Sequence, residues 1–309
     1  MEKRKTVKKS RGHARTIRVG AINITTHPHS PQGYLDLLNA IYKVRQPVKI
    51  QGKHHAHFGR MTPLSSDPLD GVTGEFHKYF NLDVDGKWFN VEDLKAANER
   101  DVAKINIPDN LKPDFEGFRY VFFPKSHRLF FEVQAYRTSQ LSPRHVEKLL
   151  TTLFSLPSIV ETFGEVDVVI EPEAEKLEEI LAMHRLRRLE IQVTRPNQDE
   201  LSKAEKEVFR RLDEEFAVRE TTILHAQPGK SLKPNNDTRT VARVAASNGK
   251  VIGEGTNENN RAVKESTQDH PWIEARQYHP SVENEFDVFV EKAKSMLASL
   301  RARVRRAGN

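Results

Sequence analysis

Residues 118–136 constrain the fold of this 309-residue chain more tightly than any other segment. Two runs of aromatic and branched apolar residues flank the sequence Pro-Lys-Ser-His at 124–127, which suits a turn because proline presets a backbone angle that turns need. Such runs bury their side chains when they pair as a hairpin and pack against another layer. We therefore predict a β-hairpin whose aromatic side chains are core or dimer contacts rather than a platform for stacking nucleic-acid bases.

The segments on either side of this hairpin alternate between strand and helix patterns. Apolar residues alternate along residues 17–26, and they recur at helical spacing along residues 31–44 and from Ser142 onward. A strand pattern follows at 165–172 and a charged amphipathic helix at 173–186. This order favours an α+β fold, in which helices pack on one face of mostly antiparallel sheets.

A second unit is predicted to begin at residue 187. Residues 238–257 are expected to form a hairpin within it, because Asn248-Gly249 is among the best short hairpin signals. Residues 281–309, capped by Ser281, predict one long C-terminal helix whose apolar stripe docks on this second unit. The expected organisation is a disordered basic tail at 1–16, an N-terminal α+β domain at 17–186 and a C-terminal α+β domain at 187–309.

Composition and missing motifs exclude several classes of protein. The chain contains no cysteine, which removes disulfide scaffolds, thiolate zinc sites and cysteine nucleophiles. No apolar run approaches the roughly 18–20 residues of a membrane span, and the basic N-terminus has no apolar core behind it, so a cytoplasmic protein without membrane insertion is expected. No glycine-rich phosphate loop or nucleophile elbow occurs, so no catalytic residue and no cofactor is assigned, and a binding protein is favoured over an enzyme.

Positive charge is concentrated at the two ends of the chain. Residues 1–18 carry +7 and residues 292–309 carry +6, so the residues between them sum to −7 in a chain whose total is +6. A solvated tail and a favourably charged helix end would also carry such residues. Because each cation that meets a phosphate releases condensed counterions, we instead predict contact with DNA. The predicted DNA-binding residues are Lys8, Lys9, Arg11, Arg15, Arg301, Arg303, Arg305 and Arg306.

Two histidine clusters are candidates for a metal site. His27 and His29 form one cluster, and His54, His55 and His57 form the other. Alternate positions on a strand share a face, as paired zinc ligands require. No further ligand lies at a diagnostic offset, so no metal site is assigned.

An acidic pair keeps a nuclease as an alternative. Asp114 and Glu132 loosely resemble the carboxylates that hold Mg²⁺ in metal-dependent nucleases, where the metal activates a water. Gln134 stands where such sites usually have a lysine. A metal-dependent nuclease of a defence system is therefore one alternative, and a defence subunit that binds protein or RNA is another.

Residues 146–181, VEKLLTTLFSLPSIVETFGEVDVVIEPEAEKLEEIL, resemble part of a known family. The pattern is a helix, a connection and a strand of the form x-D-h-V-I-x-P, with h hydrophobic, that leads into a charged helix; here the strand is Val166 to Pro172. This pattern is similar to that of the Rex A family, the phage-exclusion proteins of lambdoid phages. The order of the elements also fits over most of residues 17–306.

The resemblance implies a homodimer that binds DNA without sequence preference and acts as an intracellular sensor in abortive infection, an anti-phage defence. No functional residue is carried over from it, because the matching motif suits a core rather than a binding surface. The prediction is thus a cytoplasmic protein that binds double-stranded DNA without sequence preference. An effector protein is a further possible partner.

Overall fold

One large antiparallel sheet organises the first part of the chain. In the computed structural model, the described residues are 13–134, 139–196 and 203–307, with side chains described up to Arg303 in the last helix. Among them, nine strands form a sheet in the order β10-β1-β9-β8-β5-β3-β2, with β15 beside the first half of β1 and β4 beside β5. They are β1 (Arg15–Thr26), β2 (Val48–Gln51), β3 (His54–Phe58), β4 (Thr62–Pro63), β5 (Val72–Phe80), β8 (Glu116–Phe123), β9 (Arg128–Glu132), β10 (Val166–Ile170) and β15 (Ile273–Tyr278).

A second antiparallel sheet has the order β12-β11-β13-β14 among the described residues. Its strands are β11 (Arg185–Thr194), β12 (Arg219–His225), β13 (Gly249–Thr256) and β14 (Ala262–Ser266). The helices are α1 (Pro31–Val44), α2 (Glu99–Val102), α3 (Pro143–Phe154), α4 (Pro157–Phe163), α5 (Ala174–Leu181), α6 (Lys203–Glu214), α7 (Asn236–Ser247) and α8 (Glu285–Ala307). The predicted α+β class with antiparallel sheets and a long C-terminal helix is confirmed.

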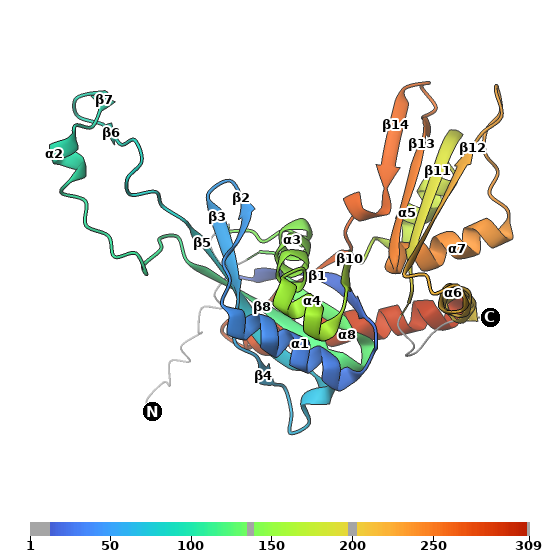
Figure 1. Cartoon of the computed structure of the whole chain (residues 1–309), viewed down its shortest axis with the longest axis horizontal. Helices are drawn as coiled ribbons and strands as arrows, with labels where there is room; N and C mark the ends of the chain where they lie inside the picture. The colour runs from blue at the N-terminus through green and yellow to red at the C-terminus, as the bar shows by residue number, and fades with distance from the viewer. Residues whose placement is uncertain (1–12, 135–138, 197–202, 308–309) are drawn as a thin grey trace, which may run out of the picture.

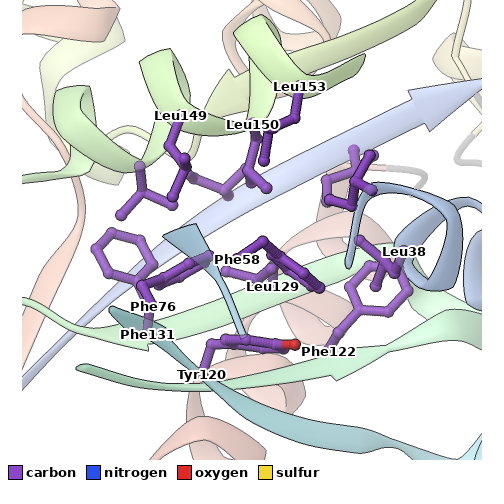
Figure 2. Packing of buried hydrophobic residues seen from close by; sticks show 14 of the residues in the cluster. Leu38, Phe58, Phe76, Tyr120, Phe122, Leu129, Phe131, Leu149, Leu150 and Leu153 are labelled. Carbon is purple, nitrogen blue, oxygen red and sulfur yellow. The ribbon is translucent and has the colours of Figure 1, made fainter. Parts of the chain in front are cut away.

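The aromatic hairpin forms the centre of the core, as predicted. Strands β8 and β9 pair around a turn at 124–127, and Phe118, Phe122 and Phe131 are fully buried. Leu149 and Leu150 of α3 pack over this face of the sheet, and α1 adds Leu38 (Figure 2). Ser142 caps α3 and Pro143 occupies its first turn, which fixes where the helix begins.

Helix α8 packs on the opposite face of the same sheet, so the expectation that it docks on the second unit is wrong. Its Phe289 and Met296 are buried against Val19 of β1 and Phe130 of β9. Helices therefore cover both faces of the first sheet rather than one. The helix also begins at Glu285, because the Asn284 side chain accepts the first free N–H groups there, rather than after Ser281.

The second sheet carries α5, α6 and α7 on one face. The predicted hairpin at 238–257 is wrong, since residues 236–247 form α7 and only Gly249 onward is a strand. Ala242 and Ala245 are buried at helical spacing, and Asn235 caps the helix through the Thr238 N–H. An Asn-Gly pair also suits the end of a helix, and that is its role here.

The connection between β5 and β8 projects away from the first sheet (Figure 1). It carries the short strands β6 (Phe89–Asn90) and β7 (Lys95–Ala96) together with α2. Several large apolar side chains on it are exposed, among them Phe89, Val91 and Leu94. This projecting connection, residues 81–115, thus presents apolar groups that its own chain does not cover.

Candidate nucleic-acid interface

The end of α8 lies against the turn of the aromatic hairpin. Arg301 Nη2 donates to Ser126 Oγ at 2.8 Å, and the Arg303 guanidinium lies 4.3 Å from the centroid of the Trp272 ring. Earlier in the helix Lys292 pairs with Glu274. Arg303 also lies close enough to the buried Glu171 to lower the pKa of that carboxyl group.

The other residues predicted to bind DNA are only partly within the description. Lys8, Lys9 and Arg11 lie outside the described residues. Arg305 and Arg306 lie in α8, but only their backbone is among the parts of the chain that the structure describes. Arg15 begins β1, is exposed and stands opposite Tyr278 of β15. The structure therefore shows separate contacts of Arg301 and Arg303 within the chain, and DNA binding by all eight residues stays a prediction.

A second group of basic side chains lies at the edge of the first sheet, and the sequence singled out only His54 among them, as part of a histidine cluster. We call His54, Lys78, His145 and Lys148 the cationic edge. Pairing of Ala56 with Lys78 puts Lys78 and His54 on the face that α3 covers. Lys78 Nζ donates to a backbone carbonyl at 2.8 Å just before α3, and Lys148 Nζ donates to a carbonyl of β2 at 3.4 Å. Together with the effect of His54 on the pKa of His145, these bonds place basic side chains from β3, β5 and α3 close together.

The other members of the cationic edge disfavour a positive charge on His145. Burial lowers the pKa of His145, and Lys78, Lys148 and His54 lower it further. Burial also lowers the pKa of Lys78, although Glu116 acts in the opposite direction. Among the described residues, neither Lys78 nor Lys148 forms an ion pair with a carboxylate. Neighbouring cations without such partners suit a phosphate group. This group could not be predicted from the sequence, because Lys78 and Lys148 lie far apart along the chain.

The histidine clusters do not meet as ligands. His27 bonds the Arg195 carbonyl at 3.1 Å, and His29 bonds the Tyr34 hydroxyl at 3.0 Å. His55 and His57 both stack on Tyr79, with ring centroids 6.1 and 5.6 Å away. Within 13–134, 139–196 and 203–307, no three histidine or carboxylate side chains are placed to hold a metal ion.

The two carboxylates of the nuclease alternative, Asp114 and Glu132, lie in different environments, one exposed and one buried. Asp114 is exposed on the connection before β8. Glu132 is buried, and its two oxygens accept the Arg119 backbone N–H at 3.0 Å and Arg119 Nη1 at 3.1 Å. Burial raises the pKa of Glu132 to about 7, although Arg119 acts to lower it. Glu132 therefore binds Arg119.

Comparisons with known proteins place the chain in a family without an assigned activity. No helix in the described part of the chain combines the length and apolar character needed to cross a membrane. Curated proteins give no match. A family model matches residues 15–294, which include both sheets and most of α8, and the chain therefore belongs to the DUF4747 family, a domain of unknown function.

Proposed function

We propose that this chain binds double-stranded DNA through backbone phosphates, without sequence preference, in an anti-phage response of the kind that the resemblance to the Rex A family implies. The observation that carries the proposal is the division of charge into +7 at residues 1–18, +6 at 292–309 and −7 between them. An acidic body repels a duplex, so attraction is concentrated where the cations gather.

The geometry of Arg303 supports this proposal. The N–H donors of a guanidinium group lie in its plane, so an arginine whose face rests on Trp272 can still donate from its edge to a phosphate. The cationic edge supplies a second phosphate-binding surface on the first sheet. Contacts of this kind position a protein on DNA but do not read its sequence.

The direct test is a salt titration of DNA binding. The full chain is mixed with two labelled duplexes of equal length and unrelated sequence, and binding is followed by fluorescence anisotropy. We expect equal affinities, with log K falling by about 0.9 per phosphate contact for each unit of log salt. Changing Arg301, Arg303, Arg305 and Arg306 to Ala is expected to weaken both complexes and to lower the salt slope by about one for each phosphate that the variant no longer binds.

A matched control removes the same charge elsewhere. Lys87, Lys95, Lys104 and Lys112 of the projecting connection are changed to Ala, and DNA binding is expected to stay as it was. An affinity that barely responds to salt contradicts the proposal, as does an arginine variant that binds normally. Stronger binding to RNA favours the RNA-binding alternative. Plasmid cleavage with Mg²⁺ that Glu132→Gln abolishes favours the nuclease.

A homodimer forms part of the same proposal. Phe89, Val91 and Leu94 on the projecting connection are 61%, 74% and 76% exposed, and such clustered apolar groups are stabilised when a second copy covers them. Sedimentation is expected to give twice the 35.5 kDa mass of one chain. Changing the three residues to Ser is expected to give monomers. A wild-type chain that sediments as a monomer contradicts this part of the proposal.

A further inference from the structure

A cleft of about 300 Å³ lies between the first sheet and the helices of the second. We call it the inter-sheet cleft. Arg128 and Glu171 line it from the ends of β9 and β10, Leu177 from α5, Ser247 from α7, and Leu300 and Arg303 from α8. This volume is at the lower end of the range for small-molecule sites, and it suits a ligand the size of a nucleoside.

The floor of the cleft is a buried ion pair. Arg128 Nε lies 2.7 Å from Glu171 Oε1, and Ser247 Oγ donates to Glu171 Oε2 at 3.1 Å. Glu171 is 1% exposed and Arg128 is 9% exposed. Behind them Asn23 Oδ1 accepts Arg128 Nη1 at 2.5 Å and lies 2.7 Å from His127 Nδ1. This network fixes a carboxylate at the cleft, and its Oε1 accepts no hydrogen bond from the described residues, so acceptor capacity is left for a ligand.

One wall of the cleft is a flat cation backed by an aromatic ring. Arg303 lines the cleft, whereas Trp272, over which its guanidinium lies, is 5% exposed and does not line it. The indole therefore supports the guanidinium from the side away from the cleft. The remaining guanidinium face is a surface on which a planar base can stack, as arginine planes do in nucleic-acid recognition. Leu177 and Leu300 add apolar wall.

We propose that the inter-sheet cleft binds a nucleotide whose base carries an exocyclic amino group. The base stacks on Arg303, and its amino group donates to the Glu171 carboxylate. Arg243 lies at the rim, where it pairs with Glu178 at 3.1 Å, and the nucleotide phosphate replaces that carboxylate as its partner. This proposal stands apart from DNA binding, because a single nucleotide rather than a duplex occupies the cleft.

The test is calorimetric titration of the full chain with AMP, CMP, UMP and ribose 5-phosphate. AMP and CMP are expected to bind saturably. UMP lacks the amino group and is expected to bind at least about tenfold more weakly, as expected when a buried acceptor loses its donor. Ribose 5-phosphate lacks the base and is expected to give no measurable binding. The absence of AMP and CMP binding at millimolar ligand overturns the proposal, and so does equal binding of UMP.

Variants locate the site. Arg303→Ala and Arg303→Lys are both expected to weaken AMP binding about tenfold or more, because lysine keeps the charge but offers no flat face. Lys294→Ala removes one exposed charge from the same helix outside the cleft, and it is expected to bind AMP normally. If Arg303→Lys also binds normally, stacking on Arg303 is wrong.

A variant that fills the cleft distinguishes nucleotide binding from DNA binding. Ala174 is exposed and lines the cleft at the first position of α5. The substitution Ala174→Phe therefore fills the cleft while every polar side chain that lines it is kept. We expect Ala174→Phe to abolish AMP binding and to leave the affinity for duplex DNA unchanged. Normal AMP binding by this variant overturns the assignment to the cleft, whatever the result with DNA.

Discussion

Changing Arg128 to Met leaves the buried Glu171 carboxylate without its cationic partner. The side chains of Arg128 and Glu171 are 11% and 2% exposed, so water screens their attraction little. At an effective dielectric constant of about 20, two charges about 4 Å apart attract by roughly 4 kcal/mol. Removal of one partner leaves the other with its desolvation penalty. We therefore expect Arg128→Met to lower the free energy of unfolding at neutral pH by roughly 3–5 kcal/mol.

The size of this destabilisation depends on pH through Glu171. Burial raises the pKa of Glu171, whereas Arg128 and the Ser247 hydroxyl lower it. Without Arg128 that pKa rises further. A carboxyl group whose pKa is raised by folding stabilises the folded state below its unfolded pKa, and this contribution is lost as the pH rises through the folded pKa. The destabilisation by Arg128→Met is therefore expected to be smaller near pH 5 than at pH 7 to 8.

Urea unfolding followed by circular dichroism at both pH values measures the effect. Adding Glu171→Gln to Arg128→Met removes the stranded charge, so this double variant is expected to recover part of the stability. Arg210 serves as the matched control, because it pairs with Glu207 and Glu214 on the exposed surface of α6. Arg210→Met is expected to change stability little. A destabilisation below about 1 kcal/mol for Arg128→Met, or one that does not vary with pH, refutes the reasoning.

Two further substitutions test a close backbone contact in the second sheet and the titration of a buried carboxyl group in the first. A Cβ on Gly249 would lie 2.1 Å from the Gln192 carbonyl oxygen, so Gly249→Ala is expected to destabilise the chain by about 1–3 kcal/mol in thermal unfolding. Gly229→Ala is its control: the added Cβ meets open space, so only the left-handed backbone at φ 74° opposes it, and it should cost less. Since burial raises the pKa of Glu132 to about 7, its contribution to stability is expected to fall as the pH rises from 5 to 8. Glu132→Gln should make the free energy of unfolding, measured in urea titrations, depend less on pH between 5 and 8. An unaltered pH profile would contradict a raised pKa for Glu132.

The local parts of the fold could be predicted from the sequence because their signals lie close together along the chain. The hairpin at 118–136 and the start of α3 at Ser142 both follow from neighbouring residues. The prediction for residues 238–247 is wrong because Asn248-Gly249 suits both a hairpin turn and a helix end. What decides between them is the burial of Ala242 and Ala245 in one cluster with Leu189 and Ile191 of the second sheet. That contact is not visible from the segment itself.

The place where α8 docks depends on a signal in another part of the chain. The apolar stripe of α8 predicts burial but does not say on which sheet. Val121, Phe122 and Phe123 are consecutive apolar residues of β8, and successive residues of a strand point to opposite faces. Such a run requires a layer on each face of the sheet, so it indicates a second covering helix. The cationic edge and the inter-sheet cleft could not be predicted in this way, because distant segments form both.

Helix α8 connects the two proposed binding events through Arg303, which lies in the predicted DNA contact and in the wall of the cleft. A nucleotide stacked on Arg303 occupies the face of that side chain and adds a negative phosphate at Arg243 across the cleft, so it weakens the attraction of this region for a duplex. Thermodynamic linkage then requires duplex DNA to weaken nucleotide binding by the same factor. Measuring DNA affinity with and without saturating AMP, and AMP affinity with and without DNA, tests this equality. Two affinities that do not influence each other would show that Arg303 cannot serve both ligands.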